Sequence, residues 1–393
     1  MKILFVANRM PFPPFRGDKL KIYNLAKALS KYHELDLITI AESKQDIESV
    51  NDLEIYFKSI DYTYVPKWKS YLNVLLTLFS NKPFQVGYFN SKAFKNKLEN
   101  KLKHYNYDAI HVQHLRMSQF IPKNIMGMAV LDLPDAFSMY WMRRYLKESN
   151  IFLRQFNRIE HLRLAKFEKK IIPKFNKTLV CSVEDQKYLE KSTNSPIKIL
   201  QNGVDIETFF PDNRIEFKPQ RILFTGNMDY APNIDAVEYF TQDIFPSILK
   251  NFPNSQFIIA GQRPVSKVKS LESKNIQVLG FIENLTDEYR KAHLVVSPLR
   301  IGAGTQNKVL ESLACGVPVV STYIGYAGLE LPDKESGVLP SSNSDEFILN
   351  VNKILSSTQY RNQLSEKGMN HIIKNFSWKG ISIKLESYLK VKT

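Results

Sequence analysis

The chain has 393 residues, of which 44% are hydrophobic, and this suits two globular domains with substantial cores. Its formal net charge of +15 fits an anionic membrane surface or anionic small ligands, but the basic residues are spread along the chain and no nucleic-acid-binding module is visible. The two cysteines indicate neither a disulfide framework nor a metal cluster. No apolar run is long enough for a signal peptide or a bilayer span, so we expect a cytoplasmic protein, with peripheral attachment to the inner face of the membrane kept open.

The chain opens with a βαβ pattern. Residues 2–7 and 35–40 predict strands, and the segment between them predicts a helix with one apolar face. In a doubly wound sheet, ligands bind at the carboxyl ends of the strands, so Arg16, Gly17 and Asp18 are predicted to face the site. The alternative for Gly17 is an ordinary turn residue.

Between residues 64 and 103 the clearest feature is an apolar helical stripe flanked by lysines and aromatic residues. This combination is typical of a helix that lies on anionic lipid. The alternative is an ordinary helix whose apolar stripe faces the core and whose lysines are solvated. The stripe consists of Leu72, Leu75, Leu76 and Phe79, and the flanking lysines are Lys67, Lys69 and Lys82.

Two further strands are predicted at residues 108–112 and 129–133. Each leads to polar residues at its carboxyl end, His114 after the first and Asp132 and Asp135 at the second. A histidine here can donate a hydrogen bond or carry a proton near neutral pH, and a packed structural histidine is the alternative. We interpret the aspartates as acceptor-side or capping residues, with Asp135 as a cap of the following helix.

The βα pattern restarts after the polar stretch of residues 205–218. Strands are predicted at residues 221–225, 257–260 and 276–279, and a glycine follows each of them. Glycines let a ligand approach the backbone closely. The residues expected at these strand ends are Gly226 and Asn227, Gly261 and Gln262, and Gly280 and Phe281.

The most informative motif, at residues 294–322, reads LVVSPLRIGAGTQNKVLESLACGVPVVST. It predicts a strand, a glycine loop, a helix from Thr305 and another strand. Free N–H groups at the start of that helix favour an anion such as a diphosphate, and Lys308 can reach the same place. Glu311 can accept hydrogen bonds from sugar hydroxyls. The alternative is an ordinary βαβ unit with a surface lysine and a surface glutamate.

The segment GAGTQNKVLESLACGVPVVST resembles the donor-binding signature of GT-B glycosyltransferases of the large retaining family 4. Glu311 matches the second of two glutamates that this family separates by seven residues, and Ala303 stands where the first is expected. A subgroup with a G-x-G-T-x-x-K loop shares this departure. Gly17 matches one of two adjacent glycines in many relatives, and Asn227 stands where many have an arginine.

The resemblance covers nearly the whole chain. It implies an α/β fold of the GT-B type, in which two Rossmann-like, doubly wound domains face a central cleft. The expected domains are an acceptor-side domain at residues 1–205 and a nucleotide-sugar-binding domain at residues 206–370. Residues 371–393 are expected to form a helix that crosses back to the first domain.

The resemblance also implies a site that needs no metal and no cofactor. Catalytic roles are expected for His114, Lys308 and Glu311. The donor and its diphosphate are expected to contact Gly17, Gly226, Asn227, Arg300, Gly302, Gly304, Thr305, Lys308 and Glu311. The nucleobase is expected near Gly261, Gln262, Gly280 and Phe281, and the acceptor near Arg16, Asp18, Asp132 and Asp135.

The implied activity is transfer of a hexose, with retention of configuration, from a UDP- or GDP-linked sugar to a glycan or a lipid-linked acceptor in the synthesis of cell-surface polysaccharide or glycoconjugate. Besides donor and acceptor, an anionic membrane surface is a candidate partner, and nucleic acid is not. A sugar-nucleotide epimerase and a non-catalytic GT-B-like scaffold remain alternatives. Transfer needs an acceptor, epimerisation does not, and a scaffold turns over no sugar nucleotide.

Overall fold

The computed structural model describes residues 1–14, 17–122, 125–212, 214–301, 306–326, 329 and 336–390. The chain forms two compact units, one of Met1–Gln201 with the C-terminal segment from Ile381, and one of Asn202–Gly380. These divisions differ from the predicted ones at 205/206 and 370/371. The end of helix α16 (Thr358–Phe376) belongs to the second unit because Ile372 and Phe376 lie in its core.

The first unit is built on a seven-stranded parallel sheet in the order β3-β2-β1-β4-β5-β6-β7. Its central strands are apolar on both faces, as a sheet covered by helices on both sides requires. The strands are β1 (Lys2–Ala7), β2 (Glu34–Ala41), β3 (Ser59–Tyr64), β4 (Ala109–Gln113), β5 (Met128–Asp132), β6 (Lys177–Val180) and β7 (Ile197–Ile199).

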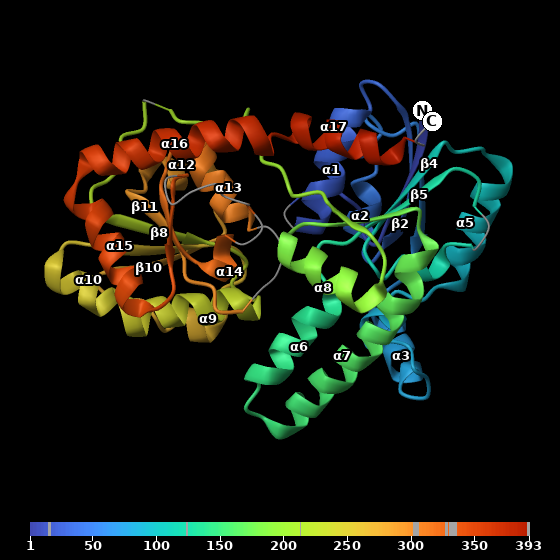
Figure 1. Cartoon of the computed structure of the whole chain (residues 1–393), viewed down its shortest axis with the longest axis horizontal. Coiled ribbons are helices and arrows are strands. Elements are labelled where there is room, and N and C mark those ends of the chain that lie inside the picture. Colours follow the sequence, from blue (N-terminus) through green and yellow to red (C-terminus); the bar gives the residue numbers. More distant parts are fainter. Residues whose placement is uncertain are drawn as a thin grey trace. The chain divides into compact units, whose positions relative to one another are not determined.

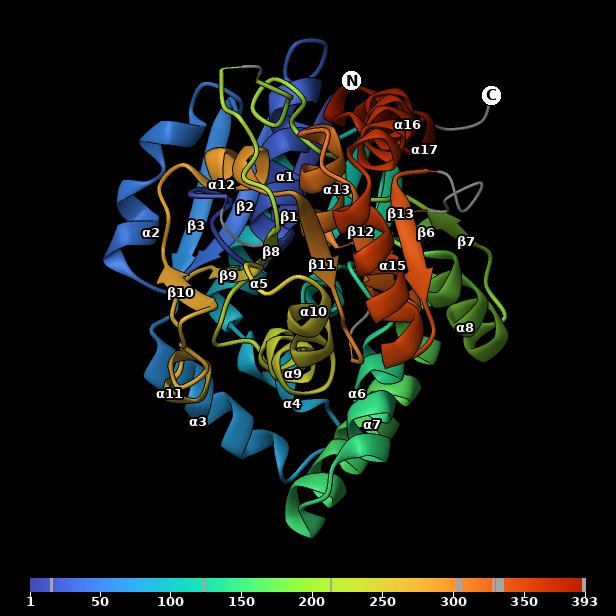
Figure 2. The same ribbon diagram turned by 90° about the vertical axis from the view of Figure 1, so that its left-hand side faces the viewer.

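Helices α6 and α7 form an antiparallel pair that projects from the first unit, on the same side as α3 (Figures 1 and 2). Asn150 begins α7 by accepting hydrogen bonds from the N–H groups of Phe152 and Leu153. The helices of this unit are α1 (Gly17–Leu29), α2 (Lys44–Glu48), α3 (Lys67–Thr77), α4 (Phe84–Tyr88), α5 (Lys92–His104), α6 (Phe137–Lys147), α7 (Ile151–Ile171), α8 (Val183–Thr193) and most of α17 (Trp378–Leu389).

The apolar stripe of α3 and the residues after it faces outward. Phe79 is 92% exposed, whereas Ser70 and Thr77 are buried. Thr77 packs so closely on Gly87 of α4 that a Cβ added to this glycine would lie 2.1 Å from the Thr77 methyl carbon. The interpretation of α3 as a core-facing helix is therefore wrong, because its small polar stripe makes the contact that its apolar stripe was expected to make.

The second unit contains a six-stranded parallel sheet in the order β10-β9-β8-β11-β12-β13, which is the Rossmann order 3-2-1-4-5-6. Alternate residues of β8 enter two cores, Ile222 and Phe224 on one face and Leu223 on the other. The strands are β8 (Arg221–Thr225), β9 (Gln256–Ala260), β10 (Ile276–Gly280), β11 (Leu294–Ser297), β12 (Val319–Thr322) and β13 (Val338–Ser341).

Helices α9 and α10 lie on one side of this sheet, and α12, α13 and α16 lie on the other (Figure 1). Besides α16, the helices are α9 (Ala231–Tyr239), α10 (Phe245–Asn251), α11 (Ser266–Lys269), α12 (Leu285–Lys291), α13 (Asn307–Ala314), α14 (Tyr323–Tyr326) and α15 (Ser344–Ser356). Helix α13 ends at Ala314, Cys315 is its C-cap, and Gly316 follows with a φ of 71°, which confirms the predicted end of this helix.

The sequence did not predict β3 or β13. Strand β13 contains Pro340 and lies at an edge of its sheet, where a residue without an N–H group is tolerated. Among the described residues, no helix combines the length and the hydropathy needed to cross a membrane.

Candidate functional site

In the second unit, the strand order reverses between β8 and β11, and ligands of such sheets bind at this switch point. Lys308 is the second residue of α13, which follows β11, and Asn233 lies in α9, which follows β8. The Lys308 Nζ donates to Asn233 Oδ1 at 2.9 Å and lies 4.2 Å from the centre of the Phe224 ring. Lys308 thus comes from the segment after β11, and its contacts come from β8 and the helix after it, which places its ammonium group at the switch point.

Lys308 is buried, with 7% of its surface exposed. Burial lowers its pKa to about 7, against the opposite influence of the Glu311 charge. Near neutral pH, the ammonium is therefore only partly populated. An anion that enters this place favours the protonated form, so the site is prepared to bind negative charge.

Glu311 is held by a hydroxyl relay. The Tyr289 hydroxyl donates to Glu311 Oε2 at 2.8 Å and lies 2.7 Å from Thr225 Oγ1 at the end of β8. Burial raises the pKa of Glu311, and the Tyr289 hydrogen bond and the Lys308 charge oppose this. Sequence reasoning missed Tyr289 and Asn233, because both come from other segments and neither stands in a recognisable motif.

Three neighbouring strands of this sheet have a glycine at the carboxyl end, Gly226 after β8, Gly261 after β9 and Gly280 as the last residue of β10. The Gly226 N–H donates to the Ala260 carbonyl at 3.1 Å, and the Gly261 N–H donates to the Gly280 carbonyl at 2.8 Å. A Cβ added to Gly261 would lie 1.6 Å from the Gly226 carbonyl oxygen, so only glycine fits there. The residue that follows each glycine was also predicted to belong to the site. Asn227 and Gln262 are half-buried, and Phe281 is exposed.

The Arg300 guanidinium forms two hydrogen bonds with Asp235 of α9, at 2.6 and 3.1 Å, and lies over the Tyr239 ring. Arg300 is therefore already held by a carboxylate at the switch point while its side chain remains half exposed. The glycine-loop residues of the prediction, Gly302, Ala303, Gly304 and Thr305, lie outside the described residues, as does Arg16.

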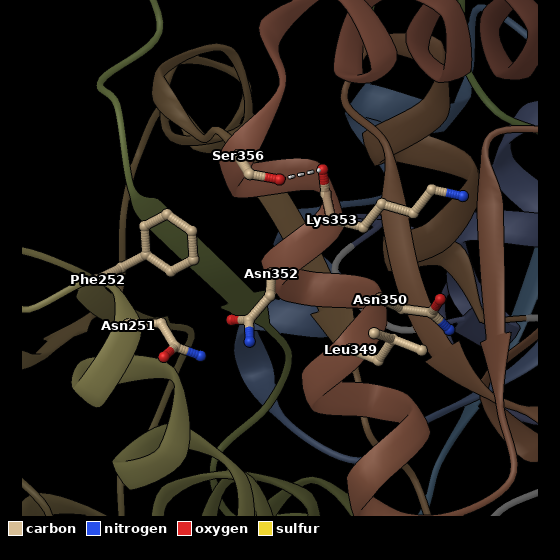
Figure 3. Close-up of a pocket in the computed structure, with 7 residues that line it drawn as sticks. All are labelled: Asn251, Phe252, Leu349, Asn350, Asn352, Lys353 and Ser356. Carbon is tan, nitrogen blue, oxygen red and sulfur yellow. Dashed lines mark hydrogen bonds between the residues drawn. The ribbon is translucent and has the colours of Figure 1, made fainter.

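A hollow of about 470 Å³ lies elsewhere in this unit, between the last turns of α10 and α15 (Figure 3). Helix α10 leads from the β8 side back to the start of β9, so its last turn lies at the amino-terminal edge of the sheet. Lys308 and the glycine strand ends lie at the other edge. The residues that line the hollow are Asn251, Phe252, Leu349, Asn350, Asn352, Lys353 and Ser356.

In the first unit, His114 lies just after β4 with a φ of 80°. Its ring stacks on Phe137 with centroids 4.4 Å apart, and its Nδ1 accepts from the Arg116 N–H at 3.4 Å, which assigns the proton to Nε2. Burial, together with the charges of Arg116 and Arg9, lowers the pKa of His114 well below its usual value. At neutral pH this imidazole is a neutral hydrogen-bonding group.

Asp132 lies in a buried cluster. Its carboxylate accepts from Lys21 Nζ at 2.7 Å and faces His111 Nε2 at 3.1 Å, and Lys21 also donates to the Leu200 carbonyl at 3.0 Å. Burial acts to raise the pKa of Asp132, but Lys21 and His111 leave it below its usual value. Sequence reasoning missed Lys21, although its place four residues before Leu25 on the inner face of α1 was an available signal.

Gly17 is the exposed first residue of α1, and Asp18, beside it, accepts from Arg9 Nη1 at 3.3 Å. Burial raises the pKa of Asp135 to about 7, and the nearby Asp185 adds to this. The prediction that Asp135 caps α6 is wrong. The N-cap of α6 is Ala136, without a side-chain cap, and the Ala136 N–H donates instead to Asp185 at 2.8 Å.

Residues 219–357 match the family model described as glycosyl transferases group 1. An uncharacterised 44.6 kDa protein in the cps region of Klebsiella pneumoniae is 24% identical over 371 residues, which cover 90% of this chain and 92% of that protein. An uncharacterised glycosyltransferase of Methanocaldococcus jannaschii is 22% identical over 424 aligned residues, which cover 100% of this chain and 98% of that protein.

Solved structures share the fold over the whole chain. Sucrose-phosphate synthase of Thermosynechococcus elongatus has a TM-score of 0.73 at 16% identity, with 98% of each chain covered. HepE of Anabaena, solved in complex with UDP-glucose, has a TM-score of 0.66 at 14% identity, with 99% of each chain covered. The family match shows a group 1 glycosyl transferase domain at residues 219–357 of the second unit, and the solved structures show that the whole chain has the GT-B fold.

Proposed function

We propose that this chain is a glycosyltransferase that transfers a hexose from a nucleotide-diphospho-sugar to a glycan or a lipid-linked acceptor, with retention of configuration. The observation that carries the donor assignment is the buried Lys308 at the β8/β11 switch point, 2.9 Å from Asn233. A UDP-linked sugar is the first choice, because HepE, which shares the fold, was solved with UDP-glucose. A GDP-linked sugar is the second.

The proposed chemistry is electrostatic. As the bond between sugar and diphosphate breaks, negative charge develops on the diphosphate, and a preorganised cation stabilises it. Lys308 can supply this cation, because an anion that enters its buried site raises its pKa from about 7 and so favours the ammonium form. Glu311, held by Tyr289, is placed to accept a hydrogen bond from the sugar or the ribose. The open space beside Gly280 suits a flat nucleobase.

On the acceptor side, we assign His114 a hydrogen bond from its Nε2–H to an uncharged oxygen. Its lowered pKa supports this role and argues against a charged general acid. A part in cell-surface polysaccharide synthesis is supported by the relative in the cps region of Klebsiella pneumoniae. A lipid-linked acceptor implies work at the cytoplasmic face of a membrane.

The test is a panel of UDP, GDP, ADP and their common sugars, measured by thermal shift with and without EDTA. Wild type is compared with Lys308→Met and with Lys250→Met, which changes an exposed lysine of the same unit. A ligand present at about 100 times its Kd stabilises the folded state by about 2.7 kcal/mol. We expect one nucleotide to raise the melting temperature in EDTA, in wild type and Lys250→Met but not in Lys308→Met.

Turnover then separates the alternatives. Consumption of the donor only when an acceptor is supplied supports transfer, and conversion of the donor to an epimer without acceptor means an epimerase. If no nucleotide raises the melting temperature of wild type, the donor site is contradicted and the non-catalytic scaffold is the alternative that remains.

A further inference from the structure

In two helical segments of the first unit, the residues around α3 and the first half of α7, large apolar side chains are exposed while polar side chains are buried. In α7, Phe152 is 84% exposed, whereas Asn157 and Glu160 are buried, and the segment around α3 has the same inversion. A helix on the surface of a soluble protein is usually arranged the other way round. The exposed apolar residues, called here the outer apolar surface, are Trp68, Tyr71, Leu72, Leu75, Leu76, Leu78 and Phe79, with Ile151, Phe152, Leu153, Phe156, Ile159 and Leu162.

Buried polar contacts hold this arrangement. The Glu160 carboxylate accepts from the N–H groups of Phe84 and Gln85 at 2.8 and 3.1 Å. Arg163 of α7 donates to the carbonyls of Thr77 and Lys82 at 3.1 and 3.3 Å. These bonds tie α3, α4 and α7 into one layer, so the outward direction of the apolar side chains is built into the fold. Both segments lie on the projecting side of the unit (Figures 1 and 2).

Within the two segments that carry the outer apolar surface, the exposed charges have one sign. Residues 67–82 include three lysines and no acidic residue. In residues 151–170 the acidic side chains, Glu160 and Glu168, are both buried. The exposed charged residues of that stretch are Arg154, Arg158, Lys166, Lys169 and Lys170. A basic rim around apolar and aromatic side chains complements an anionic bilayer and repels a second copy of itself.

A pocket of about 280 Å³ lies among these helices, lined by apolar residues of α3, α4, α6 and α7 and by Arg9 and Arg116. Arg9 is paired with Asp18 and Glu42 at 3.3 and 3.2 Å. Arg116 donates to the amide oxygen of Gln85 at 3.1 and 3.2 Å and stacks on Phe89. Within the described part of the chain, no carboxylate lies within 4.0 Å of the Arg116 guanidinium.

Arg116 is therefore the cation in this pocket whose charge is not directly paired. Burial, and then the charge of Arg9, lowers its pKa to about 10, although Asp18, Glu42 and Glu160 act in the other direction. The carboxylate of Glu160 also lines the pocket, but it is turned to the N–H groups of α4. An incoming phosphate would relieve the Arg116 charge.

We propose that the first unit docks on an anionic lipid bilayer through the outer apolar surface, and that the pocket beside it binds the phosphate-bearing end of a lipid-linked acceptor. The apolar walls Val74 and Phe156 connect the pocket to α3 and α7, so one amphiphile can satisfy the guanidinium and the bilayer together. This inference rests on the proposed function only in its identification of the bound lipid phosphate as the acceptor. Bilayer docking and lipid-phosphate binding do not depend on the proposed function.

The surface is tested by co-sedimentation of the full chain with phosphatidylcholine vesicles that contain either no phosphatidylglycerol or 30% of it. Leu76→Glu and Phe152→Glu are compared with Leu349→Glu in the second unit, because Leu76 is 67% exposed and Leu349 is 66% exposed. We expect wild type and Leu349→Glu to bind the vesicles that contain phosphatidylglycerol and not the vesicles that lack it. The variants at Leu76 and Phe152 should partition at least tenfold less.

Equal binding by all variants, or no binding by wild type, overturns the surface proposal. A concentration-dependent dimer that Leu76→Glu abolishes does so too, since it makes the surface a protein interface. UDP thermal shifts on the same samples separate the two proposals, because a retained UDP shift without vesicle binding refutes only the docking.

The pocket is tested by calorimetry with dodecyl phosphate below its critical micelle concentration, with inorganic phosphate and with octyl glucoside. We expect wild type and Arg214→Gln, an exposed arginine of the second unit, to bind dodecyl phosphate at least tenfold more tightly than the other two probes. Arg116→Gln should lose this binding at least tenfold while it sediments with anionic vesicles as wild type does. Equal affinity for inorganic phosphate, or unchanged binding by Arg116→Gln, refutes a lipid-phosphate pocket.

Discussion

The substitution Lys308→Met should stabilise the ligand-free protein at neutral pH while it removes donor binding. The pKa of Lys308 falls from the ordinary 10.5 to about 7 in the folded chain. The unfolded chain therefore keeps this proton up to a higher pH than the folded chain does, and stability rises with pH between the two values. Each pKa unit corresponds to about 1.4 kcal/mol, so the buried charge costs about 4 kcal/mol at pH 7 and about 1.4 kcal/mol at pH 9.5.

Methionine removes this cost but leaves the Asn233 side-chain oxygen without its donor, a loss of about 2 kcal/mol. The net expectation is a gain of about 2 kcal/mol at pH 7 and no gain at pH 9.5. Urea denaturation of wild type, Lys308→Met and Lys250→Met at both pH values, without nucleotide, measures it. A Lys308→Met protein that is less stable than wild type at pH 7, or a difference that does not change between the two pH values, would refute the reasoning.

Three further outcomes are expected. Gly261→Ala should cost about 3 kcal/mol or more in urea unfolding, since its Cβ would meet the Gly226 carbonyl at 1.6 Å. Gly280→Ala should cost about 1 to 2 kcal/mol, because an added Cβ would meet no atom and only the φ of 69° is unfavourable for alanine. Equal losses of stability in Gly261→Ala and Gly280→Ala would contradict the packing argument. Asp132→Asn leaves the buried Lys21 without its carboxylate and should cost about 3–5 kcal/mol, so an unchanged melting temperature counts against that ion pair. Finally, UDP binding at pH 8 should take up about one proton, because the diphosphate raises the pKa of Lys308. Calorimetry in two buffers of different ionisation enthalpy measures this uptake. No proton uptake would mean that Lys308 does not contact the diphosphate.

The second unit could be predicted well because its information is local. Its strands are short apolar runs, three of them have a glycine at the carboxyl end, and Lys308 and Glu311 stand in one continuous motif with the strand before them. Their partners could not be predicted. Asn233 lies 75 residues before Lys308 and Tyr289 lies 22 residues before Glu311, and nothing but the folded sheet brings them together.

The first unit shows the limit of periodicity. The spacing of the apolar residues in α3 correctly predicts a helix, but it does not say which stripe the rest of the protein will cover. Here the answer depends on the fit of Thr77 against Gly87, ten residues later, and on Arg163 in another helix. The buried Lys21–Asp132 pair was missed for the same reason, since the partners are 111 residues apart.

The first unit is not continuous in sequence, and this affects the order of events during synthesis. Leu385 and Leu389 of α17 are buried in it, and Lys177 donates to the Tyr388 carbonyl at 2.7 Å, so its last contacts are made by residues synthesised after the whole second unit. At about 5–20 residues per second, the interval between Gln201 and Ile381 is on the order of 10–40 seconds. Throughout that interval the nascent first unit lacks the segment that covers this part of its core, while the second unit already has its whole sequence by the time Ile381 is added. A chain truncated after residue 380 and released from the ribosome should accordingly expose the first unit, and not the second, to chaperones and proteases.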